Sequence, residues 1–313
     1  MSDQTATTPE QALAWEAERR PRVVFAAGTG ALLILGGGLF SGVATSRDYP
    51  TVGLVQAITP ALHGRVTAAI DPHLAAAQFY KDHTTQLTTA AAVTALGTIL
   101  MAYVLVYLAR AVRARRPDFP PAFRALPVVG AVGVTITSIG FAVALGHNAG
   151  TYLDGPRTAD AVHFIQQHGA ALSVIRPIAI ASQLALAFGI VVISLNAMRV
   201  GLLTRFMGVL GIIVGVLFVI PTGTLPVVQA FWLGALAVLF LQRWPSGQPR
   251  AWLTGQAEPW PSGQDMARQR EAERNRAEAK AIQEAPADSE SDAAEPVRPA
   301  HPSSKKRRKK RRR

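Results

Sequence analysis

Arg176 is the only charged residue that lies well inside any long apolar run of this sequence. Its run, residues 170–195, is long enough to cross a bilayer as a helix. His168, Arg176 and Gln183 lie on one side of that helix, because their spacing follows the helical repeat. An arginine at membrane depth is costly and normally faces protein, water or an anion. The stripe therefore predicts recognition of an anionic ligand, and the alternative is that Arg176 only snorkels to the lipid headgroups.

A second polar stripe, formed by His83, Thr94 and Thr98, lies on an earlier apolar segment. If the two stripes face each other, they form an outward-facing cleft that carries a cation without a matching carboxylate. Such a cleft suits a small anionic solute or a lipid phosphate. The candidate ligand-binding residues are therefore Arg176, His168, Gln183 and His83.

Motifs of known catalytic classes are missing from the sequence. It has no H-E-x-x-H zinc motif, no G-x-S-x-G elbow, no P-loop and no G-x-G-x-x-G after a strand. It has no cysteine, and the apolar runs contain no Asp or Glu, which argues against proton relays, cation-coupled carriers and intramembrane aspartate proteases. The histidines lack the spacing of a metal site. We therefore predict no catalytic residue, no metal site and no cofactor, and the chain is not expected to be an enzyme.

Six apolar runs organise the chain, which is 49% hydrophobic and has a mean hydropathy of +0.21. Long apolar blocks of this kind are typical of membrane proteins, and they predict an all-α, polytopic membrane bundle of six transmembrane helices. The last two runs are short. Leu202 and Leu203 extend the fifth if Arg205 snorkels, and a re-entrant hairpin around residues 221–223 is the alternative. The runs are residues 23–44, 90–108, 126–145, 170–195, 206–220 and 224–241.

The sequence divides into an N-terminal segment (1–22), a transmembrane domain (23–242) and a C-terminal tail (243–313). Thr8, Pro9 and Gln11 have the pattern of an N-cap, a first-turn proline and a capping box. The first segment therefore forms a short helix to Arg20 or stays frayed.

Further patterns concern helix starts and repeats. Asp71 and Pro72 predict a helix that begins outside the membrane and continues into the second span. Residues 78–83 and 163–168 both contain Phe and His four positions apart, which suggests two parallel copies of one helical hairpin. Two glycine pairs are spaced for close helix contact, within one bundle or between copies in a homo-oligomer: Gly38 with Gly42 and Gly211 with Gly215.

The placement of Lys and Arg predicts the orientation. Ten of these residues, all Arg, flank the runs on one side, and four lie on the opposite side over longer loops. The tail adds 17 to the first side. We therefore predict a multi-pass plasma-membrane protein with both termini in the cytoplasm.

The tail changes character along its length. The motif of residues 244–248 recurs at 260–264, and its tryptophans and Trp252 suit the cytoplasmic interface. Residues 265–285 suit a solvated helix, and residues 286–304 are expected to be disordered. Residues 305–313 are all basic and are expected to contact anionic lipid headgroups. Nucleic-acid binding or a merely solvated end are the alternatives, and the former is disfavoured because no aromatic residue interleaves the charges.

Residues 196–211, with the sequence NAMRVGLLTRFMGVLG, and the Ala/Arg-rich composition resemble multi-pass membrane proteins of unknown function from high-GC actinobacteria. The resemblance covers at most the six spans, and it implies a compartment and an architecture rather than an activity. Three hypotheses remain open. The first is a non-enzymatic plasma-membrane protein without a defined ligand. The second is a transporter or receptor for a small anionic solute or lipid at Arg176. The third is a membrane-anchored interaction protein that acts through its basic tail.

Overall fold

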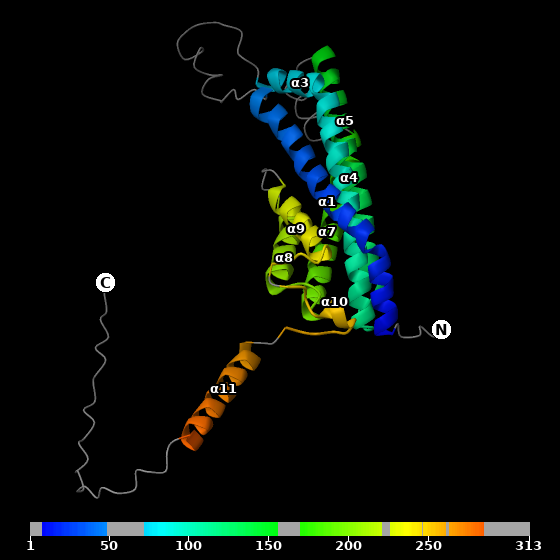
Figure 1. The fold of residues 1–313 in the computed structure, drawn as a ribbon. Coiled ribbons are helices and arrows are strands. Elements are labelled where there is room, and N and C mark those ends of the chain that lie inside the picture. The colour runs from blue at the N-terminus through cyan, green and yellow to red at the C-terminus, as the bar shows by residue number, and fades with distance from the viewer. Residues whose placement is uncertain are drawn as a thin grey trace, which may run out of the picture. The chain divides into compact units, whose positions relative to one another are not determined.

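Helices make up the regular structure of the described residues, which contain no strand (Figure 1). The structure is a computed structural model that describes residues 8–48, 72–155, 170–220, 226–245, 247–260 and 263–284. The chain forms two compact units, Met1–Trp260 and Pro261–Arg313. By length and composition, four helices of the first unit can cross a membrane, as expected for a membrane helix bundle. They are Pro9–Val43, Thr84–Arg115, Pro121–Asp154 and Ala171–Arg199.

Helix α1 (Pro9–Asp48) begins where the sequence predicts. The Thr8 backbone N–H donates to Gln11 Oε1 at 3.1 Å, and the Gln11 N–H donates to Thr8 Oγ1 at 3.3 Å. This capping box satisfies backbone donors that the first helical turn would leave unpaired. The helix then continues through Pro21, so the N-terminal segment and the first apolar run form one helix of 40 residues.

The second long helix is preceded by a shorter one. Helix α3 (Pro72–Asp82) is separated from α4 (Thr84–Arg115) only by His83, so helical structure does begin before the apolar run. A 3₁₀ turn, η1 (Pro121–Arg124), leads into α5 (Ala125–Asp154), and α7 (Ala170–Arg199) is the fourth long helix. Asp71 and residues 163–168 lie outside the described residues, so the predicted repeat remains a prediction.

Close helix packing in the first unit depends on small residues. Helix α1 packs along α4 and α9, α5 packs between α4 and α7, and α7 also packs along α8. Gly130 of α5 lies so close to the backbone of Leu186 that a Cβ would overlap it. Gly211 and Gly215 of α8 lie in the same way against α7. These glycines therefore serve contacts within one bundle, and homo-oligomerisation remains a prediction.

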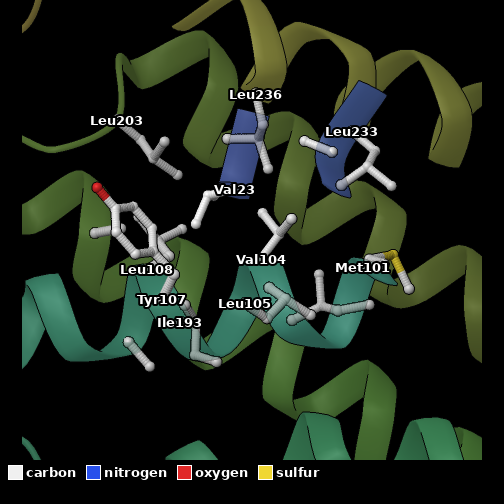
Figure 2. Close-up of a cluster of buried hydrophobic side chains, with 14 of the residues drawn as sticks. Val23, Met101, Val104, Leu105, Tyr107, Leu108, Ile193, Leu203, Leu233 and Leu236 are labelled. Atoms are coloured by element: carbon white, nitrogen blue, oxygen red, sulfur yellow. The ribbon is translucent and has the colours of Figure 1, made fainter. Parts of the chain in front are cut away.

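The hydrophobic core joins α1, α4, α7, α9 and the turn after α7. Figure 2 shows its side chains pointing toward one another from these elements. The residues labelled there are Val23, Met101, Val104, Leu105, Tyr107, Leu108, Ile193, Leu203, Leu233 and Leu236.

Helices α8 (Arg205–Val219) and α9 (Val227–Phe240) have 15 and 14 residues. At 1.5 Å per residue each extends about 21–22 Å, less than the bilayer core of about 30 Å. The expectation that Leu202 and Leu203 extend the fifth run is wrong. Thr204 caps α8 by accepting a hydrogen bond from the Met207 N–H at 3.2 Å, so the helix starts after these two leucines. Both are instead fully buried in the core.

The first unit continues past the predicted domain boundary at residue 242. Residues 244–260, which we call the strap, include the short helix α10 (Ala251–Thr254). Trp252 Nε1 donates to the carbonyl oxygen of Leu202 at 2.8 Å, and Trp260 Nε1 donates to that of Leu203 at 2.8 Å. Trp252 is thus buried in protein instead of resting in the membrane interface.

The second unit contains α11 (Gly263–Glu284). Its described side chains are exposed, and Arg274 pairs with Glu278 one turn later at 3.7 Å. The predicted solvated helix is therefore confirmed. The stretches expected to be disordered (286–304) and lipid-binding (305–313) lie outside the described residues.

Candidate functional site

A groove of about 1070 Å³ lies between the helices of the first unit. Residues of α1, α4, α5 and α9 line it, together with Tyr80 of α3 and Phe218 of α8. Figure 1 shows why space remains there, because α1 crosses α4 and then diverges from it toward the end that carries α3. We call this space the lateral groove.

Small side chains widen the lateral groove. Glycine, alanine, serine and threonine recur every three or four residues on the facing sides of α1 and α4, so each set shares one helix face. Larger residues, such as Leu105 and Leu108, fill the corresponding space in the core. The small residues that line the groove are Gly37, Gly38, Ser41, Gly42 and Thr45 of α1 and Ala90, Ala91, Thr94, Ala95 and Thr98 of α4.

Hydroxyl groups provide most of the polarity of the groove, and none of the described residues that line it is charged. The Thr94 hydroxyl donates to the carbonyl oxygen of Ala90 at 3.0 Å, and that of Thr98 donates to the carbonyl oxygen of Thr94 at 2.9 Å. A hydroxyl that donates its proton in this way still has lone pairs to accept a hydrogen bond. The groove therefore offers scattered acceptors on an otherwise apolar wall.

The first turn of α9 also lines the lateral groove, through Pro226, Val227, Val228 and Gln229. In the part of the chain that the structure describes, the half-buried Gln229 amide has no hydrogen-bond partner. An amide presents both donors and an acceptor. Gln229 is thus the side chain best suited to recognise a carbonyl or hydroxyl group of a ligand.

Arg176 and Gln183, the predicted ligand-binding residues of α7, are both exposed on one face of that helix. The neighbouring apolar side chains Val174, Ile180 and Phe188 are more than half exposed on the same helix. Exposed apolar residues of this kind are what a membrane helix presents to lipid. Neither Arg176 nor Gln183 lines the lateral groove.

The residues of the predicted polar stripe on the second span do not lie together in the structure. Thr94 and Thr98 line the lateral groove and face α1, whereas His83 stacks on Phe79, with ring centroids 4.5 Å apart. The His83 ring nitrogen Nδ1 also lies 3.0 Å from the carbonyl oxygen of Phe79. His168 is outside the described residues. Among the residues described, no group of three or more His, Asp or Glu side chains is arranged to hold a metal ion.

Comparison with known proteins found no relative of this chain. No protein-family model, no curated protein and no solved structure matches this chain. The site must therefore be judged from its own chemistry.

Sequence reasoning missed a buried polar cluster at the end of the first unit opposite the lateral groove. We call this end of the unit the arginine-rich end. It is formed by the start of α1, the end of α4, η1, the turn after α7 and the strap. Glu16 and Arg115 form a fully buried ion pair there. Tyr107 stacks between Trp15, at 5.3 Å, and Trp252, at 6.0 Å between ring centroids. In the sequence Glu16 lies close to Glu18 and Arg19, and nothing local identified Arg115 as its partner.

Proposed function

We propose that this chain is an integral plasma-membrane protein that binds an uncharged lipid from the bilayer in the lateral groove, without catalysing a reaction. The observation that carries the proposal is a cavity of about 1070 Å³ whose described lining contains no charged residue. Most of its lining residues belong to α1, α4 and α5, which have the length and composition of membrane spans. A molecule that reaches such a groove from the side has to be soluble in the hydrocarbon core.

The proposal includes a topology. Helices α8 and α9 are too short for two full crossings, so they form a re-entrant hairpin that starts and ends at the arginine-rich end. Broken helices at membrane depth are tolerated where they are buried in protein or line a cavity. The first turn of α9 meets this condition by lining the lateral groove. With four spans plus a hairpin, both termini lie on one side, and the excess of arginine there makes that side cytoplasmic.

The ligand chemistry of this proposal differs from the anion predicted at Arg176. A charged headgroup inside the groove would lose its hydration, and none of the described lining residues offers a compensating charge. A neutral lipid with a hydroxyl or ester group would instead pair with Gln229 and place its chains against glycine and alanine. Anion binding at Arg176 remains a separate prediction.

The proposal can be tested by a substitution that fills the lateral groove with a large side chain. The variant Ala91→Trp places a large side chain into the lining, and Ala92→Trp places the same side chain on the adjacent exposed position of α4 as the matched control. Neutral lipid that co-purifies with the full chain in mild detergent is quantified by mass spectrometry. We expect Ala91→Trp to lower retention about tenfold or more relative to wild type, and Ala92→Trp to retain it. Equal retention by both variants would contradict the proposal.

A further inference from the structure

Three arginines gather where α4 ends and α5 begins. Arg110 and Arg113 are three residues apart on α4, so they are neighbours on its surface. Arg124 ends η1, which packs against α4 and precedes α5, and the charges of Arg113 and Arg110 act on it. Arg113 and Arg124 are half-buried. The cluster therefore concentrates positive charge at one place on the arginine-rich end.

Two of the carboxylates near this end of the first unit are paired with other arginines, and Asp118 is exposed in the loop between α4 and η1. Glu16 is committed to Arg115 in the buried pair, and Glu18 lies 3.6 Å from Arg19. Arg110 also lies above the Trp15 ring, 5.9 Å from its centroid. An aromatic ring holds a guanidinium by cation–π attraction without neutralising its charge.

Apolar surface continues directly from the cluster. Below Arg124, residues Val128, Val132 and Ile136 follow at intervals of four on α5, and all three are exposed. Below Arg110, the exposed residues Tyr103, Ile99 and Leu96 follow at intervals of three to seven on α4. The cluster thus lies at the end of two apolar stripes, and in a bundle that spans a bilayer this is the level where headgroups meet acyl chains.

We propose that Arg110, Arg113 and Arg124 bind the phosphate of an anionic phospholipid whose acyl chains lie along these two stripes. The planar guanidinium forks match phosphate oxygens bidentately, and basic pockets between membrane helices on the cytoplasmic side bind anionic headgroups. This site lies at the end of the first unit away from the groove and takes a ligand of opposite character, so it does not depend on the groove. A free phosphate ion would satisfy the arginines but would leave the stripes without a role.

The experiment compares two triple variants with the same change in charge. In the first, Arg110, Arg113 and Arg124 become Gln; in the control, the exposed residues Arg199, Arg243 and Arg250 become Gln. Both keep the complete basic tail. Binding of phosphatidylglycerol to the full chain is measured by native mass spectrometry, with phosphatidylcholine as the neutral reference. We expect the cluster variant to lose about tenfold in phosphatidylglycerol affinity and the control to lose less than about threefold.

Two further measurements make the result specific. Arg113→Lys, which keeps the charge and removes the fork, should lower the affinity partly and remains informative if the triple variant folds poorly. Millimolar inorganic phosphate should fail to displace phosphatidylglycerol from the wild-type protein. Equal losses in the two triple variants, or displacement by inorganic phosphate, would overturn the proposal.

Discussion

Glu16 of α1 and Arg115 of α4 form an ion pair in which both side chains are completely buried. Arg115 also donates to the carbonyl oxygen of Ala251, from Nη2 at 2.6 Å and from Nε at 3.1 Å. One guanidinium therefore joins α1, α4 and the strap. Because the strap is bound in this way, the start of α1 and the end of the first unit lie together at the arginine-rich end.

Removing one partner of this pair should destabilise the first unit. Glu16→Leu leaves the Arg115 charge buried without its carboxylate, which costs about 3–5 kcal/mol of unfolding free energy. The double variant Glu16→Leu with Arg115→Met should regain most of this loss, because no charge is then left unpaired. Thermal unfolding in detergent measures both. Glu18→Gln, which removes an exposed partner of Arg19, should change stability by less than about 1 kcal/mol; an equal shift in Glu16→Leu would show that the buried pair has no structural role.

The contact of the strap with the turn after α7 should depend on Gly201. Its φ of +78° favours glycine, and a Cβ there would overlap the carbonyl oxygen of Glu258. Gly247 has a φ of +84° and nothing within 4 Å of an added Cβ, so Gly247→Ala is a control with the same backbone strain and no overlap. We expect Gly201→Ala to make the strap cleavable by trypsin at Arg250 several-fold faster than Gly247→Ala does. Equal cleavage rates would argue that Gly201 is needed only for its backbone conformation.

Topology can be tested with single cysteines, because the chain contains none of its own. Asp154→Cys lies at the end of α5 away from the arginine-rich end, and Asp118→Cys lies in the exposed loop before η1. We expect a membrane-impermeant maleimide to label Asp154→Cys on intact cells and Asp118→Cys only after lysis. The reverse pattern would place the arginine-rich end outside the cell.

Substitution of Arg176 distinguishes snorkelling of its side chain from recognition of an anion. If its exposed side chain only snorkels, Arg176→Leu should insert normally, since leucine in a span is more favourable than arginine by a few kcal/mol. Unchanged occupancy by co-purified anions in native mass spectra is then expected. A selective loss of an anionic ligand in Arg176→Leu, with partial recovery in Arg176→Lys, would instead restore the predicted anion site.

Local and compositional features of this fold were predictable from the sequence. The capping box at Thr8 depends on residues three apart, and α11 depends on the composition of its own segment. The four candidate spans follow from apolar runs long enough to cross a bilayer. Each of these signals is contained within one element.

Features that depend on which helix faces meet were not predictable. Helical spacing placed Arg176 and Gln183 on one face, but Ser182 is the residue that packs against Gly133 of α5. The pairing of Glu16 with Arg115 joins residues 99 positions apart, and no local pattern specifies it. The lateral groove likewise arises from the divergence of α1 and α4, which depends on the packing of the whole bundle.

The most direct test of the groove is to find where a lipid lies. A diacylglycerol with a photoactivatable diazirine in its acyl chain is incorporated into liposomes with the full chain, irradiated, and its adducts are mapped by peptide mass spectrometry. We predict that adducts concentrate on groove residues such as Ala91 and Phe141 over lipid-facing residues such as Val174 and Ile180, and that Ala91→Trp removes this enrichment whereas Ala92→Trp keeps it. Adduct yields that are equal on groove residues and on the exposed face of α7 would contradict the account.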